Sequence, residues 1–178
     1  MSLDLSTIET ALVALVNSIL TTDTVIIADQ NAPRPAGIYT LIKIVDIGTA
    51  GIEASTFEDQ DGPDIDLIET VEAQRDLLVS FNCFYGSAMT RANKLRLLVS
   101  SNSALELLNA AGLGIGKVSD IREMTSVVDG LFESRAQFDL NLYASDSEDL
   151  ITLAILTAKI SGEFEEGGNS IDIEIEET

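Results

Sequence analysis

The stretch FESRAQFDLNLY, Phe132–Tyr143, alternates apolar and polar residues along its length. A two-residue period of this kind is typical of a strand with one face buried in a core and the other face in water. We therefore expect an amphipathic strand here, in a sheet that is covered on one side. The residues expected on the buried face are Phe132, Ala136, Phe138, Leu140 and Leu142. Those expected on the polar face are Glu133, Arg135, Gln137, Asp139 and Asn141.

Three helices are predicted from apolar residues that recur at helical spacing. In the first, Ser6 and Glu9 lie three residues apart, as in a capping box. Ser103 and Glu106 repeat that pattern before the third helix, and Gly112 has the character of the glycine that follows a helix end. The helices are expected over about residues 4–20, 88–99 and 104–111.

Further strands are expected over residues 25–28, 38–47 and 65–85, where β-branched and alternating apolar residues are concentrated. The simplest topology pairs segment 38–47 with segment 65–85 as a hairpin. The order of helix, strands, two helices and strands predicts an α+β fold, with an antiparallel sheet covered by helices on one side.

A chain of 178 residues fits one domain, which we expect to span residues 1–166. Within it, residues 48–64 are predicted to form a long acidic loop. The remaining residues, 167–178, read GGNSIDIEIEET and are expected to be a separable acidic tail. Because isoleucine and acidic residues alternate in it, this tail either adds to the sheet edge of a neighbouring molecule or is disordered.

The composition is strongly acidic, with a net charge of −20 and a pI of about 4.1. Such a chain repels DNA, so binding to phosphates is not expected. No apolar run reaches the length of a membrane span, and the N-terminus lacks the basic region of a signal peptide. The single cysteine, Cys83, is expected to be a buried core residue. We expect a soluble protein made in a reducing cytoplasm.

Most catalytic chemistry is missing from the sequence. The chain has no histidine, which excludes Ser-His-Asp triads and Cys/His zinc sites. The segment Ala111–Val118, AGLGIGKV, lacks the first glycine and the final Ser or Thr of a phosphate-binding loop. A hydrolase built on paired carboxylates remains as an alternative. We expect no enzymatic activity and no cofactor.

The segment Ser55–Asp66, STFEDQDGPDID, contains several closely spaced acids. Read as an EF-hand from Asp59, it has glycine at the wrong position and lacks the final glutamate. A solvated, self-repelling loop is the favoured interpretation, with a looser calcium site as the alternative. In a ring around a channel, such a loop would line or guard the opening. The candidate acids are Glu53, Glu58, Asp59, Asp61, Asp64 and Asp66.

Three segments, taken in order, resemble the neck or tail terminator proteins of long-tailed bacteriophages: Pro33–Ile44, Val79–Val99 and Ile121–Ala144. The first is a proline-flanked entry to a strand, the second an aromatic-Tyr-Gly strand end before an alanine-rich helix, and the third an aromatic-Glu-x-Arg-Ala-x-Phe strand. Relatives commonly have tryptophan where this chain has Phe132. The matching residues are Pro35-Ala36-Gly37, Phe84-Tyr85-Gly86 with Ala88 and Ala92, and Phe132-Glu133 with Arg135, Ala136 and Phe138.

This resemblance implies a non-enzymatic virion protein with a tail-terminator-like fold. It implies a ring, usually a hexamer, that caps the tail tube, stops its polymerisation and joins it to the connector and neck proteins of the head. DNA would pass through the lumen without specific binding, and a tail sheath is a further partner to consider. The protein would be made in the host cytoplasm and would end in the virion. The alternatives are a tail tube or head-completion protein, or a calcium-binding interaction module.

Positive charge is scarce, with ten basic residues against thirty acidic ones. Basic residues are therefore candidates to pair with acids across subunits, although a local surface pair explains each one as well. Glu133 and Arg135 lie two residues apart on one strand face, which also fits a simple side-by-side pair. The candidate basic residues are Arg34, Lys43, Arg75, Arg91, Arg96 and Arg135.

Overall fold

The computed structural model describes residues 3–29, 31, 33–59, 66–128, 130–153, 157–163 and 170–176. The chain divides into two compact units. Unit 1 comprises residues 1–53 and 72–147, and unit 2 comprises residues 54–71 and 148–178. The predicted boundary at residue 166 does not coincide with this division, and the single domain over 1–166 stays a prediction.

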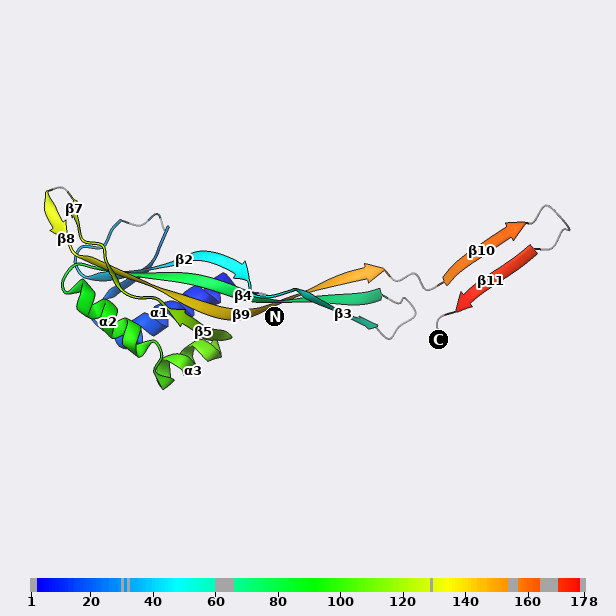
Figure 1. The fold of residues 1–178 in the computed structure, drawn as a ribbon, viewed down its shortest axis with the longest axis horizontal. Helices are drawn as coiled ribbons and strands as arrows, with labels where there is room; N and C mark the ends of the chain where they lie inside the picture. Colours follow the sequence, from blue (N-terminus) through cyan, green and yellow to red (C-terminus); the bar gives the residue numbers. More distant parts are fainter. Residues whose placement is uncertain are drawn as a thin grey trace. The chain divides into compact units, whose positions relative to one another are not determined.

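The α+β fold expected from the sequence is confirmed, with three helices and a mixed, mostly antiparallel seven-stranded sheet (Figure 1). The helices are α1 (Leu5–Ile19), α2 (Ala88–Leu98) and α3 (Asn102–Ala110). The sheet contains β1 (Thr24–Ile27), β2 (Tyr39–Thr49), β3 (Ala54–Asp59), β4 (Asp66–Phe84), β5 (Leu113–Val118), β6 (Arg122–Glu123) and β9 (Arg135–Leu153). Two further pairs are β7 (Ser126–Val128) with β8 (Leu131–Glu133), and β10 (Thr157–Glu163) with β11 (Ser170–Glu176).

The main path through the sheet is β1-β2-β4-β9-β5, with β3 beside β4 and β6 beside β9. The predicted hairpin is present, because β2 pairs antiparallel with β4 from Tyr39↔Phe84 to Thr49↔Arg75. One pair departs from the antiparallel expectation. Strand β1 is parallel to β2, which requires the chain to cross over between them through residues 28–38.

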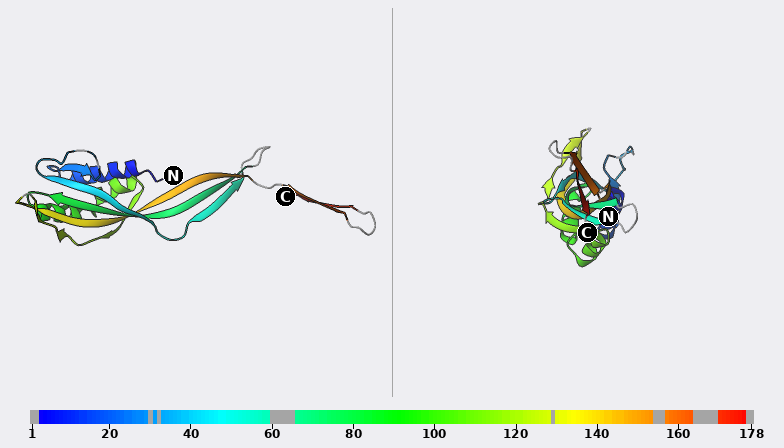
Figure 2. Two further views of the ribbon diagram at one scale, coloured as in Figure 1. Left: turned by 90° about the horizontal axis from the view of Figure 1, so that it is seen from above. Right: turned by 90° about the vertical axis from the view of Figure 1, so that its right-hand side faces the viewer.

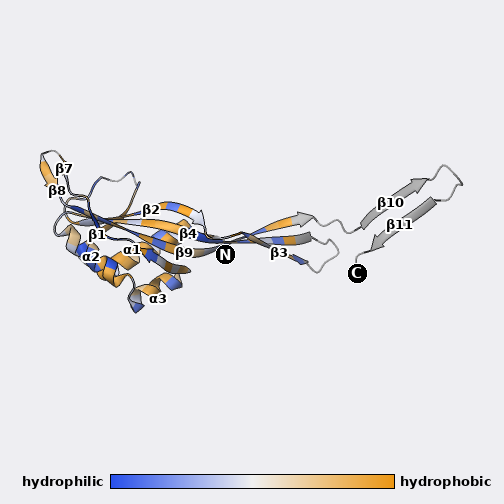
Figure 3. Cartoon of the chain, viewed as in Figure 1, coloured by the Kyte–Doolittle hydropathy of each residue, from blue (hydrophilic) through white to orange (hydrophobic). Residues whose placement is uncertain are grey.

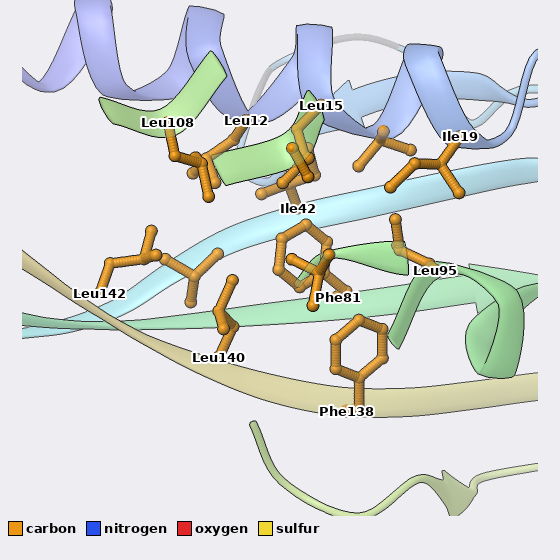
Figure 4. Packing of buried hydrophobic residues seen from close by; sticks show 14 of the residues in the cluster. Leu12, Leu15, Ile19, Ile42, Phe81, Leu95, Leu108, Phe138, Leu140 and Leu142 are labelled. Atoms are coloured by element: carbon orange, nitrogen blue, oxygen red, sulfur yellow. The ribbon is translucent and has the colours of Figure 1, made fainter. Parts of the chain in front are cut away.

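The core of unit 1 lies between the helices and one face of the sheet (Figure 4). Leu12, Leu15 and Ile19 point from α1 toward Ile42 and the β4 and β9 side chains. The rings of Phe81 and Phe138 stack with centroids 5.1 Å apart. Helix α1 lies beside β1 and β2, as the view from above in Figure 2 also shows. The residues that β4 and β9 contribute to the core cluster alternate along each strand, as the sequence predicted, although Ser80, Asn82 and Phe84 on the other face of β4 are also buried.

The residues that cap the N-termini of α1 and α3 lie two positions before the serines of the predicted capping boxes. Asp4 caps α1, accepting a hydrogen bond from the Ser6 amide at 3.0 Å, and the Ser6 and Thr7 hydroxyls also bond this carboxylate. These bonds lower the pKa of Asp4. Ser101 caps α3 through the Ala104 amide. The predicted glycine after α3 is confirmed, since Gly112 has φ of +72°.

The prediction of an uninterrupted loop over residues 48–64 is wrong, because strand structure enters this range at both β2 and β3. Strand β2 continues to Thr49, and residues 54–59 form β3, paired with β4. The β-branched and aromatic residues of ASTFED favour a strand, and this preference outweighs the tendency of its acidic residues to stay in a solvated loop. Also in unit 2, β10 pairs antiparallel with β11 in register Ile160↔Ile173. Residues 170–176 of the expected acidic tail thus pair within their own chain.

Candidate functional site

A buried ion pair supports the end of β4 in unit 1. Arg91, on α2, donates through Nη1 to Asp23 Oδ2, and the Thr40 hydroxyl donates to the same oxygen at 2.6 Å. The side chains of Arg91 and Asp23 are 11% and 0% exposed. Arg91 Nη2 also donates to the backbone carbonyls of Phe84 and Tyr85, at 2.7 and 2.8 Å. This arginine therefore holds the turn between β4 and α2 inside the protomer.

The turn that Arg91 holds is conformationally unusual. Tyr85 has φ of +63° and Gly86 has φ of +54°, and a tyrosine rarely adopts such a value. The Tyr85 amide donates to the carbonyl of Ser134 at 2.8 Å, which ties the turn to the junction between β8 and β9. These hydrogen bonds hold the backbone that carries the Phe84 and Tyr85 rings.

Three aromatic rings surround one arginine. Tyr39 and Phe84 stack with centroids 4.5 Å apart, and Tyr85 meets Tyr39 edge-on at 6.0 Å. The guanidinium carbon of Arg34 lies 5.3–5.7 Å from all three ring centroids, within cation–π range. Arg34 Nε donates to the Tyr39 hydroxyl at 2.7 Å. Burial raises the pKa of Tyr39.

Glu133 is the acidic residue of this cluster and contacts both Arg34 and Tyr85. It accepts from Arg34 Nη2 and, at 3.3 Å, from the Tyr85 hydroxyl, and its side chain is nearly buried. The hydrogen bond to Glu133 raises the pKa of Arg34. The partner of Glu133 is therefore Arg34, ninety-nine positions away in sequence, and the structure gives no ion pair between Glu133 and Arg135.

Arg135 differs from the other arginines. Its Nε and Nη2 both donate to Asn82 Oδ1, at 3.2 and 2.7 Å, and its guanidinium carbon lies 5.1 Å from the Phe84 centroid. Among the residues with described side chains, every other arginine forms an ion pair, whereas no carboxylate lies within salt-bridge distance of Arg135. An amide oxygen does not neutralise a guanidinium, so among the described side chains the charge of Arg135 has no counter-ion.

Two hollows adjoin this cluster. The larger has a cavity volume of about 420 Å³, and its lining includes Ile26, Leu41, Phe84 and both Arg34 and Arg135. The smaller, of about 220 Å³, is lined by Arg34, Tyr85, Val128, Leu131, Phe132 and Glu133. Because Arg34 and Glu133 line both, the hollows are neighbours, and together they offer aromatic, aliphatic and cationic contacts.

The other candidate basic residues have partners within the chain. Arg75 pairs with Asp146 at 2.8 Å and with Glu53 at 3.3 Å, and its hydrogen bond to Asp146 lowers the pKa of that carboxyl. Arg96 donates to the carbonyl of Ser119 and pairs with Asp120, and Lys43 pairs with Asp29. With Arg91–Asp23 and Arg34–Glu133, these pairs give five of the six candidate basic residues a carboxylate partner in their own chain, and among the described residues Arg135 is the exception. Contacts of these residues across subunits stay a prediction.

The acidic candidates are only partly described. Glu53 pairs with Arg75, and Glu58 is exposed on β3. Asp59 ends β3 and Asp66 begins β4, while Asp61 and Asp64 lie outside the described residues. Within the described part of the chain, no group of three or more His, Cys, Asp or Glu is placed to hold a metal ion. No helix in that part is long and apolar enough to cross a membrane.

The strand predicted over residues 132–143 is interrupted at Ser134, which the sequence did not lead us to expect. Phe132 was expected on the buried face with Phe138, but Phe132 is 83% exposed and Glu133 is buried. The predicted strand is split into β8, which pairs with β7, and β9, which enters the main sheet. The sequence does contain a turn signal before this strand, Asp-Gly at positions 129 and 130, and Gly130 has φ of +79° between the paired strands β7 and β8.

Comparison with known proteins supplies one match. The family model described as "Phage neck terminator protein" matches residues 6–168, which is most of the chain. No curated protein matches.

Proposed function

Since the chain belongs to the phage neck terminator protein family, we propose that it forms a ring on the end of the tail tube and stops the tube from growing further. Membership of the family gives the chain a structural role in the neck of the virion, among other tail and head-connector proteins. Beyond this role, we propose that the ring closes around a lumen, that it terminates the tube, and that DNA passes through the lumen.

The family match over residues 6–168 is the observation that carries this proposal, because it includes the main sheet, α2, α3 and all of α1 except Leu5. The proposed ring is a hexamer, with one face on the tube protein and the other on the connector, and with a sheath as a further partner in a contractile tail. Assembly would take place in the host cytoplasm. The protein would act without catalysis or a cofactor.

Charge supports the lumen part of the proposal. At −20 for each chain, a ring presents a large negative field to the DNA in its channel, reduced by bound counterions. DNA then slides without the phosphate contacts that make other protein–DNA complexes tight. We propose that the acids of Glu53–Asp66 face this channel or an axial partner.

The experiment mixes the purified protein with tail tube protein that is polymerising. Capped tubes should stop at shorter lengths as the protein is added in larger amounts, and electron microscopy should show one ring at a tube end. Light scattering on the protein alone gives its oligomeric mass. Tubes that grow to unchanged lengths would refute termination, and unlimited polymers of the protein itself would identify a tube protein.

The same mass measurement, repeated with and without a chelator, tests the calcium alternative. A change of mass or stability that depends on calcium would favour a metal site around Asp59–Asp66, whereas equal results would remove that alternative.

A further inference from the structure

The β7–β8 hairpin of unit 1 exposes an unusual amount of apolar surface. Phe132 and Leu131 are 83% and 75% exposed, and Val127 and Val128 are also exposed. Figure 3 shows the hydrophobic colour of this hairpin. Within the described residues it pairs with no further strand, and a two-stranded hairpin is marginally stable in water by itself. Contiguous exposed apolar residues of this kind mark a surface that another protein covers.

A charged group lies close to the same surface. The hollow beside the hairpin, lined in part by Leu131 and Phe132, shares Arg34 and Glu133 with the larger cavity that contains Arg135. In these two hollows Arg34 is already neutralised by Glu133, whereas Arg135 is not neutralised by any described carboxylate. A partner that covers the hairpin can therefore place a carboxylate on Arg135, in a site where Phe84 screens the guanidinium from water on one side.

We infer that this surface, consisting of Val127, Val128, Leu131, Phe132 and Arg135, binds a second copy of the chain. The neighbouring copy covers the hairpin with apolar residues and supplies the carboxylate that Arg135 lacks. This inference rests on the proposed ring, and it names the side of the protomer through which the ring is built.

Charge favours a second copy as the occupant. The chain has thirty acidic and ten basic residues, so the surface of a neighbouring copy offers carboxylates in excess. Glu133 of the hairpin is already paired with Arg34, so in the proposed contact an acid other than Glu133 reaches Arg135 from the neighbouring copy. In the proposed ring this contact joins two different surfaces, and a contact of that type closes into a ring when the rotation between copies closes.

The experiment uses the full chain with four single substitutions. Phe132→Ser and Arg135→Gln change the proposed surface, and glutamine can still hydrogen-bond Asn82. Leu97→Ser and Lys94→Gln are the matched controls. Leu97 is 71% exposed on α2, and Lys94 is an exposed cation on the same helix. Circular dichroism checks that each variant is folded. Sedimentation over a concentration series measures self-association, with about tenfold weakening expected for each surface variant and none for the controls.

A photo-reactive benzoylphenylalanine at position 132, compared with one at position 97, identifies what covers the hairpin. Crosslinks from position 132 to another copy, which are lost in the Arg135→Gln background, are the expected result. Equal association of all four variants, or crosslinks from position 132 only to tube or connector protein, would overturn the inference. If copies crosslink as expected but tubes continue to grow, the proposed termination fails while this interface stands.

Discussion

Removing Arg91 should destabilise the protein more than removing any exposed cation. The substitution Arg91→Met keeps most of the aliphatic volume but leaves the Asp23 carboxylate, which is 0% exposed, with the Thr40 hydroxyl as its described donor. It also takes a donor from the carbonyls of Phe84 and Tyr85. The ion pair, both carbonyl bonds and the turn they support are lost together.

The expected loss of unfolding free energy is about 3–5 kcal/mol, the usual cost of leaving one buried charge without its partner. For a chain of this length that loss lowers the melting temperature by about 6–20 °C. The double variant Asp23→Asn/Arg91→Met removes both charges, so it should lose less than the sum of the two single variants. Lys43→Met, which breaks a pair between two exposed side chains, should cost less than about 1 kcal/mol.

Urea unfolding followed by far-ultraviolet circular dichroism measures these differences, since the chain has no tryptophan to serve as a fluorescent probe. A loss for Arg91→Met no greater than that for Lys43→Met would refute the argument that the pair is buried and holds the turn. Additive losses in the double variant would show that Asp23 and Arg91 act independently.

Three further predictions concern unit 1. Leu12→Ala removes a fully buried core side chain and should cost about 2–5 kcal/mol in urea unfolding, and a loss below 1 kcal/mol would contradict the packing. The pKa of Asp146 is lowered by Arg75, so its contribution to stability is present above the ordinary value of 3.8 and is lost as pH falls through the lowered pKa. Melting temperatures measured from pH 7 to pH 2 should therefore fall less steeply on the acid side for Asp146→Asn than for the wild type, and parallel curves would count against the shift. Glu133→Gln removes the carboxylate from Arg34 and should lower stability by about 1–3 kcal/mol, a loss that calorimetry would detect.

The helices and strands of this fold could be predicted where apolar residues recur with one constant spacing along a segment. The parity of β4 and β9, the β2–β4 hairpin and the helix order all follow from such patterns, and they are confirmed. The prediction for Phe132 failed because alternation gives a face only while the strand is continuous. One interrupting residue, Ser134, changes the parity of everything before it.

The partners of the charged residues could not be predicted in the same way. Arg91 and Asp23 are sixty-eight positions apart, and Arg34 and Glu133 ninety-nine, so only the folded sheet brings them together. With thirty acids in the chain, sequence alone offers every cation many partners. The scarcity of cations suggested an interface in general, whereas the structure singles out Arg135 among the arginines.

The break at Ser134 separates a segment with an exposed apolar surface from a strand whose apolar residues form the core. Before it, Leu131 and Phe132 are exposed, and after it, Ala136 and Phe138 are part of the core. A substitution of Leu131 or Phe132 is therefore expected to leave the packing of Ala136 and Phe138 unchanged. The exposed side chains at positions 131 and 132 can therefore differ among related chains while the core residues of β9 stay the same.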